Sequence, residues 1–263
     1  LALPVYSVIN GSGLMLGIGG ATKYAIMKNQ GNKKYNESFM NTVFMAIVIG
    51  IIFFLTGIIF SGNIATLLGA NKQVYHMTSI YLKVLLMFGP AFVLNNVMNA
   101  FVRNDGNPRL SMIAMLVGSF GNIILDYLLV IKFSMGMFGA VLATGFSPIM
   151  GLMVLSGHIV SENSNIKFKV AKIRASFIKS IIMLGIPSFV AEMSSGIVIF
   201  VFNIIILGLQ GNVGVAAYGV IANLALVVIS IYTGVAQGSQ PLFSAAYGKN
   251  DKKMQKQLFK YAI

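Results

Sequence analysis

Long apolar stretches alternate with short polar segments along the whole chain, which predicts helices that cross a membrane. A crossing helix needs about 20 mainly apolar residues. The stretches do not alternate polar and apolar positions as the strands of a membrane barrel do. Seven stretches qualify, and an eighth begins near Met254: 3–27, 40–60, 78–102, 110–131, 136–160, 180–208 and 213–247. The sequence therefore predicts an all-α membrane protein, a polytopic helical bundle.

Basic side chains gather in every second connection between these stretches. They are Lys23, Lys28, Lys33 and Lys34 after the first stretch, Arg103 and Arg109 after the third, Lys167, Lys169, Lys172, Arg174 and Lys179 after the fifth, and Lys249, Lys252, Lys253 and Lys256 after the seventh. The opposite connections carry only Lys72, Lys132 and the uncharged segment 210–212. Because basic loops stay in the cytoplasm, we expect a multi-pass protein of a cell membrane whose basic loops are cytoplasmic.

The composition supports a lipid-facing surface. Charged residues make up 10% of the chain and hydrophobic residues 57%, whereas soluble domains carry about 25% charge. The net charge of +13 does not predict nucleic-acid binding, because the basic residues are separated by apolar stretches rather than gathered on one soluble face. The absence of cysteine excludes disulfides, thiolate metal sites and thiol nucleophiles.

A weak internal repeat divides the chain into two lobes. Shifting the sequence against itself places Gly17 on Gly234, Thr22 on Ser239 and Gly31 on Gly248. The two copies lie six spans apart and point the same way through the membrane, as in transporters with two similar lobes. We expect a first lobe at 1–160, a cytoplasmic connection at 161–179 and the start of a second lobe at 180–263.

Two acidic residues lie inside predicted spans, where a charge costs about 2.5–3.5 kcal/mol. They are Asp126 and Glu192, whereas Glu37, Asp105, Glu162 and Asp251 are expected in solvated loops. Acids within the membrane usually face a cavity or a partner. The alternative is an acid that stays protonated or is neutralised by a fixed structural neighbour.

Asn122 lies one helical turn before Asp126, so both side chains share one helix face. They can offer oxygen ligands to a small cation, or tune a carboxyl group that binds a proton. Thr144 on the next span can complete such a site. Alone, Asn122 is typical of helix packing, and Thr144 of a hydroxyl bonded to its own helix.

The remaining unusual residues have ordinary interpretations. We expect Lys83 to reach outward along the lipid rather than line a pathway, and His76 and His158 to lie near span ends without binding metal. Pro90, Pro148 and Pro187 can each kink a helix, although packing alone also explains them. The glycines of the first span indicate close helix contacts.

Five segments together resemble the multidrug and toxic compound extrusion (MATE) transporters. They are 103–108 (RNDGNP), 122–126 (NIILD), 139–144 (GAVLAT), 184–188 (LGIPS) and 238–242 (GSQPL). The resemblance implies a bacterial protein with two lobes of six helices each. The chain would then begin at the second helix and end entering the ninth, so both lobes would be incomplete and the first would lack its first helix.

The resemblance also implies functional residues. Asn122, Asp126 and Thr144 match the cation site of the family's first lobe in type, order and spacing. Some members carry a second-lobe acid on the seventh helix, where Glu192 lies at a different distance from Pro187 than in sodium-coupled members. The implied function is an antiporter without a cofactor, which exchanges Na⁺ or H⁺ for organic, often cationic and lipophilic, compounds.

We expect such a transporter to be a monomer that binds small organic substrates and the lipid bilayer and has no enzymatic activity. One alternative is a flippase for lipid-linked saccharides, which handles anionic phosphates and would need basic side chains in its cavity. Lys83 is the sole basic candidate within a span, which favours cationic or neutral cargo. Another alternative is an inactive transporter fragment, since the chain lacks an initiator Met and stops within an apolar stretch.

Overall fold

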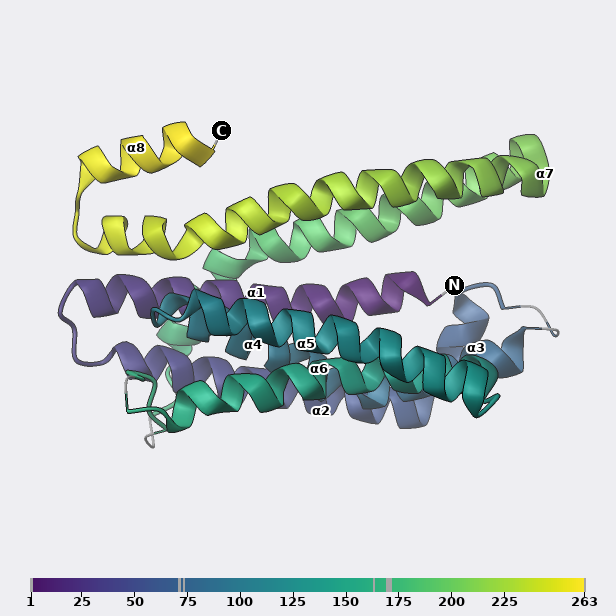
Figure 1. Cartoon of the computed structure of the whole chain (residues 1–263), viewed down its shortest axis with the longest axis horizontal. Helices are drawn as coiled ribbons and strands as arrows, with labels where there is room; N and C mark the ends of the chain where they lie inside the picture. The colour runs from purple at the N-terminus through teal and green to yellow at the C-terminus, as the bar shows by residue number, and fades with distance from the viewer. Residues whose placement is uncertain (1, 71, 73, 163, 169–171, 263) are drawn as a thin grey trace.

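The chain folds into a bundle of long helices, most of which run along one common direction (Figure 1). The structure is a computed structural model that describes residues 2–262 apart from 71, 73, 163 and 169–171. Within these residues there is no strand, which confirms the predicted all-α fold. In chain order the helices are α1 (Leu3–Asn29), α2 (Tyr35–Leu67), α3 (Tyr75–Met87), α4 (Gly89–Asn104), α5 (Pro108–Asp126), the π-helix η1 (Tyr127–Lys132), α6 (Gly136–Val160), α7 (Ala175–Gly248) and α8 (Lys252–Ala262).

The helices are long and apolar enough for a multi-pass membrane protein. Five spans of the described chain meet both criteria: α2, α5 continued by η1, α6, and the two arms of α7, Ala175–Phe202 and Ala217–Gly248. The pair α3 and α4 makes a sixth, bent by 44° at its break. These six correspond to six of the seven predicted spans. The remaining predicted span is α1, a helix of 27 residues that is less apolar because it contains glycine and polar residues. It packs against α2, α4 and α7.

Two breaks in the helices shape the bundle, and the sequence predicted both of them. The bend between α3 and α4 follows Phe88, and Pro90 stands at the start of α4, as expected of a residue that cannot continue a helical hydrogen-bond ladder. Gly211 has φ +63° and ψ −154° and joins the two arms of α7. Figure 1 shows α7 turning back on itself at this end of the molecule. By contrast, α6 continues through Pro148, and the first arm of α7 through Pro187.

Glycines let α1 approach its neighbours closely, as predicted. A methyl group on Gly17 would lie 2.7 Å from the carbonyl oxygen of Asn96 on α4. A methyl group on Gly19 would collide with the Ile181 carbonyl, and one on Gly185 with the Met15 carbonyl. Helices in lipid associate through such close packing, so these glycines fix α1 between α4 and the first arm of α7.

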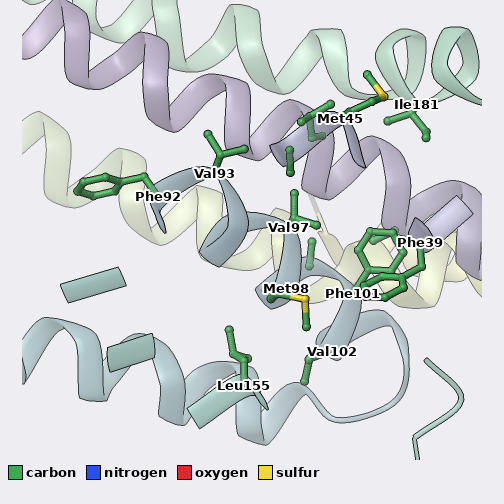
Figure 2. Packing of buried hydrophobic residues seen from close by; sticks show 14 of the residues in the cluster. Phe39, Met45, Phe92, Val93, Val97, Met98, Phe101, Val102, Leu155 and Ile181 are labelled. Carbon is green, nitrogen blue, oxygen red and sulfur yellow. The ribbon is translucent and has the colours of Figure 1, made fainter. Parts of the chain in front are cut away.

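The apolar core lies between α1, α2, α4, α6 and the first arm of α7 (Figure 2). The Phe101 ring lies edge-on against Phe39, with centroids 5.1 Å apart, and against Tyr24 at 5.5 Å. Such pairs contribute about 0.5–1.5 kcal/mol beyond the area they bury. Val97 and Leu155 continue the core toward α6. None of the described residues buried in this core comes from the second arm of α7.

The connection between α6 and α7 is attached to the first helices by amides of α2. The Asn41 side chain donates to the Lys172 carbonyl at 3.3 Å and accepts from the Arg174 backbone at 3.0 Å. The Asn36 amide donates to the Asn165 carbonyl at 3.1 Å. We predicted the connection to extend over 161–179, and its last five residues are already helical because α7 begins at Ala175. Lys169 lies outside the described residues.

Candidate functional site

Asp126 is the last residue of α5, and the helix changes its form immediately after it. The next six residues, Tyr127–Lys132, form the π-helix η1. Single π-helical turns within α-helices are rare and often mark functional positions. Since six residues remain before this span ends, the carboxylate lies nearer to the end opposite the basic loops than to the basic loops themselves.

Tyr81 on α3 connects Asp126 with Thr144 on α6. Its hydroxyl lies near enough to the Thr144 hydroxyl and the Asp126 carboxylate to interact with both. The Thr144 hydroxyl also donates to the Ala140 carbonyl at 2.9 Å, which is the local bond expected of a threonine in a helix. The structure thus brings Asp126 and Thr144 to the same tyrosine, a residue that sequence reasoning did not select.

Asp126 and Asn122 have unused bonding capacity. Both residues are half-buried, and in the described part of the chain no side chain forms a hydrogen bond or salt bridge with the Asp126 carboxylate. The Asn122 amide nitrogen is buried without a hydrogen-bond partner. A buried polar group without a partner is costly. The Asp126 carboxylate can therefore take up a proton or a cation, and the Asn122 amide N–H can donate to an acceptor such as water.

Glu192 lies apart from this group, at the boundary between α7 and the earlier helices. It lines two adjoining cavities: a polar one of about 330 Å³ between α1, α4, α5, α6 and α7, and a larger one of about 660 Å³ between α1 and the two arms of α7. Asn122, Asp126 and Thr144 line neither of them. The four predicted site residues thus form one group of three and one separate acid.

An amide chain holds Glu192 in place. The Asn96 side chain of α4 donates to the Asn10 oxygen at 2.9 Å, and the Asn10 nitrogen donates to a Glu192 carboxylate oxygen at 2.9 Å. A hydrogen bond to an ionised acceptor is about twice as strong as a neutral one. The sequence offered an indication of these hydrogen bonds, because Asn10 and Asn96 are polar residues inside apolar stretches.

The expectation that Lys83 is the only basic residue within a span is wrong. Arg103, which we assigned to a loop, belongs to α4, is half-buried and lines the polar cavity together with Glu192. Its Nη1 donates to the Gln237 side-chain oxygen at 2.9 Å. Lys83 itself is exposed and lines neither central cavity, as expected of a lysine that reaches outward. The helix continues past the end of the apolar stretch, which is why the sequence placed Arg103 outside it.

The expectation that Asp105 lies in a solvated loop is also wrong. Its side chain is fully buried and accepts hydrogen bonds from the Tyr24 hydroxyl at 2.7 Å, the Lys28 ammonium at 2.7 Å and the Asn165 backbone at 2.8 Å. The His158 ring nitrogen Nε2 lies 2.9 Å from its other oxygen. Burial raises the pKa of the Asp105 carboxyl, but the bonds from Lys28, Tyr24, His158 and Asn165 outweigh it and lower that pKa.

Polar side chains also join the second arm of α7 to the first helices near the basic loops. The Gln240 side chain donates to the Thr22 hydroxyl of α1 at 2.7 Å and accepts from the Asn104 amide of α4 at 2.7 Å. With the bond between Arg103 and Gln237, these contacts connect the two lobes at one end of the bundle. Hydrogen bonds between neutral groups contribute about 0.5–1.5 kcal/mol each, so the two bonds of Gln240 add moderately to the packing of this arm.

Comparisons with known proteins give the same family throughout. The sequence profile of the MatE family matches residues 1–128 and 169–263. The multidrug export protein MepA of Staphylococcus aureus is 30% identical over 259 residues, which are 97% of this chain and 57% of the relative. MepA of Staphylococcus saprophyticus is 30% identical over 268 residues, covering 100% of this chain and 58% of the relative.

Solved structures share the fold. A MATE transporter in complex with MaD5 superposes with a TM-score of 0.89 at 23% identity, over 99% of this chain and 60% of that one. An inward-facing MATE family transporter of the MOP superfamily superposes with a TM-score of 0.77 at 22% identity, again over 99% and 60%. The chain therefore spans somewhat more than half the length of the proteins it matches.

Proposed function

Since the chain belongs to the MatE family of multidrug transporters, we propose that the whole protein is a cation-coupled antiporter. It exports organic, often cationic and lipophilic, compounds in exchange for Na⁺ or H⁺, and its basic loops face the cytoplasm. The observation that carries this proposal is the Asp126 group: an acid inside a span, without a bonded partner in the described chain, beside the unsatisfied amide of Asn122.

The coupling ion binds at Asp126 in this mechanism. The carboxylate supplies the charge, Asn122 and Thr144 supply neutral oxygen atoms, and Tyr81 lies beside both Asp126 and Thr144. Oxygen ligands of this kind suit Na⁺, and the same carboxylate can take up a proton instead. Neutralising the acid removes the cost of a charge within the membrane, so the occupied and empty states favour different helix arrangements.

The cargo binds in the central cavities, away from the ion. The larger cavity of about 660 Å³ has the size of a drug-binding site, and apolar and aromatic residues such as Tyr6, Ile199 and Tyr218 contribute to its lining. Glu192 supplies a negative charge for a cationic cargo. Coupling then requires that ion and cargo each bind the two lobe arrangements with different affinity.

The decisive experiment is Asp126→Asn in the full-length protein, reconstituted in vesicles. We expect cation-driven efflux of a cationic dye to fall about 100-fold, the upper range of coupling between two sites, while the protein remains folded. Glu162→Gln is the matched control, because Glu162 is exposed in the connection. Efflux that continues undiminished in Asp126→Asn would rule out the proposed ion site. Imposing a Na⁺ gradient and a pH gradient separately identifies the ion.

One observation favours a second candidate, a flippase for lipid-linked saccharides. Arg103 gives the polar cavity the basic side chain that a phosphate-bearing cargo requires. The acid Glu192 in the same cavity and the multidrug export relatives favour the antiporter. Transbilayer movement of a fluorescent lipid-linked sugar in vesicles, without efflux of the cationic dye, would support the flippase. Residues 1–263 expressed beside the full-length protein test whether the shorter chain is active.

A further inference from the structure

Arg103 carries a charge beside the polar cavity, and no acid of the described residues forms a salt bridge with it. In the described part of the chain its one side-chain partner is the neutral amide of Gln237, and no carboxylate lies within salt-bridge distance of it. Its Nε is buried without a hydrogen-bond partner. The neighbouring acid in sequence, Asp105, is already bound by Lys28 and His158.

A half-buried guanidinium with one neutral partner is energetically unfavourable. A buried charge is costly unless it is both paired and hydrogen-bonded. The planar guanidinium presents parallel N–H groups that match the two oxygens of a carboxylate. Both the unsatisfied Nε and the missing counter-charge would be satisfied by one carboxylate entering from the cavity.

The rest of the polar cavity suits a ligand that also carries a positive charge. Glu192 lines the same space of about 330 Å³ as Arg103, so the cavity presents an acid and a base to one bound molecule. The Asn95 side-chain oxygen is buried without a partner and can accept a hydrogen bond. The cavity also adjoins the larger one through shared lining residues, among them Tyr6 and Met115, which leaves room for an apolar body.

We propose that Arg103 is an anion-binding subsite of the cargo site and selects amphoteric compounds, which carry a carboxylate together with a cationic group. The carboxylate binds at Arg103, the cationic group lies toward Glu192, and the apolar body extends into the larger cavity. This inference rests on the proposed export function. It adds to that function a residue that separates amphoteric cargo from purely cationic cargo.

Two dyes that differ in one group test the proposal. Rhodamine 6G is an ester and a cation, and rhodamine 19 is the free acid of the same dye and is zwitterionic. Their affinities for the purified full-length protein are measured by fluorescence anisotropy without an ion gradient. We expect Arg103→Gln to weaken binding of rhodamine 19 about 10-fold, the effect of losing one charge-assisted hydrogen bond, and to change binding of rhodamine 6G less than twofold.

Three further variants separate a direct role from a structural one. Arg109→Gln removes the same charge at an exposed position outside the cavity and should leave both affinities unchanged. Glu192→Gln should weaken binding of both dyes, because both carry the same positively charged ring system. Gln237→Ala removes the partner of Arg103 but keeps the guanidinium, so it should weaken rhodamine 19 less than Arg103→Gln does, although Gln237 also lines the cavities.

The proposal is overturned if Arg103→Gln weakens both dyes equally, if it weakens neither, or if Gln237→Ala reproduces its effect. Should Arg103→Gln fail to fold, Arg103→Lys provides the test: it keeps the charge without the planar fork and should weaken rhodamine 19 about threefold. Equilibrium binding is independent of ion coupling. A protein that binds both dyes as predicted but shows no cation-driven efflux would therefore disprove the antiporter and leave the subsite standing.

Discussion

Two aspartates at opposite ends of the bundle illustrate two uses of a carboxylate in this protein. Asp105, near the basic loops, is completely buried and is bound by Tyr24, Lys28, His158 and the Asn165 backbone. Asp126, toward the other end, is half-buried, and no described side chain forms a hydrogen bond or salt bridge with it. One carboxylate is saturated with partners, whereas the other still has bonding capacity.

The difference separates a structural acid from one that is available to a ligand. Asp105 connects α1, the end of α4, α6 and the connection to α7 through a single side chain. Any ligand would have to break several charge-assisted bonds to reach it. A ligand at Asp126 breaks no such bond. Burial alone therefore does not distinguish a structural acid from one that is available to a ligand, and the number of fixed partners is the better guide.

The largest difference should appear in stability. Removing one member of a buried charged group leaves the other charge uncompensated and costs about 3–5 kcal/mol, so Asp105→Ala should lower the free energy of unfolding of the full-length protein by that amount. Asp126→Ala should change it by less than about 1 kcal/mol, because no bonded partner is lost. Denaturant unfolding in detergent measures both. Equal losses would mean that Asp126 is as structural as Asp105.

Acid should weaken the Asp105 contacts at the low end of the pH range. The pKa of this carboxyl is lowered from its ordinary value of 3.8 in the folded protein, so its ionised form stabilises the fold. That contribution is complete above the unfolded pKa and disappears as the pH falls from about 4 through the lower folded value. The unfolding temperature should therefore fall more steeply below pH 4 in the unmodified protein than in Asp105→Asn.

Comparing unfolding temperature against pH for the unmodified protein and for Asp105→Asn isolates the Asp105 carboxyl group, because the remaining acids titrate in both proteins. Parallel curves would show that Asp105 is not stabilised as an anion. The effect should be smaller than that of Asp105→Ala, because a protonated carboxyl group keeps its volume and part of its hydrogen bonding.

Hydrophobic pattern predicted the helices well because it depends on local sequence. The spans, the reversal at Gly211 and the bend near Pro90 all follow from residues within one element. Asn122 and Asp126 could likewise be paired from their spacing of one turn. Their shared neighbour Tyr81 could not, because it belongs to a helix distant in sequence and nothing local distinguishes it from other interfacial tyrosines.

Two of the wrong assignments concern one polar segment, 103–108, and a third concerns Glu37, which lies in the first turn of α2 rather than in a loop. The residues of segment 103–108 are typical of an exposed turn, so both Arg103 and Asp105 were expected in solvent. Whether they are buried depends on His158, Asn165 and Gln237, which are 53 or more residues away. Partners brought together by the tertiary fold decide the environment of such charges, and a single sequence does not reveal which partners will meet.

The smallest effect should come from the most exposed partner of Asp105. The Lys28 ammonium donates to the carboxylate at 2.7 Å, but 29% of its side chain remains exposed. Lys28→Met keeps the apolar stem and removes the charge, and we expect it to cost about 1.5 kcal/mol, the lower range for a hydrogen bond to a charged group. Lys33→Met at an exposed position nearby is the control and should cost less than about 0.5 kcal/mol.

The loss at Lys28 should be smaller than that of Asp105→Ala because Tyr24, His158 and the Asn165 backbone still hold the carboxylate. A loss as large as that of Asp105→Ala would instead mean that the lysine alone neutralises the buried charge.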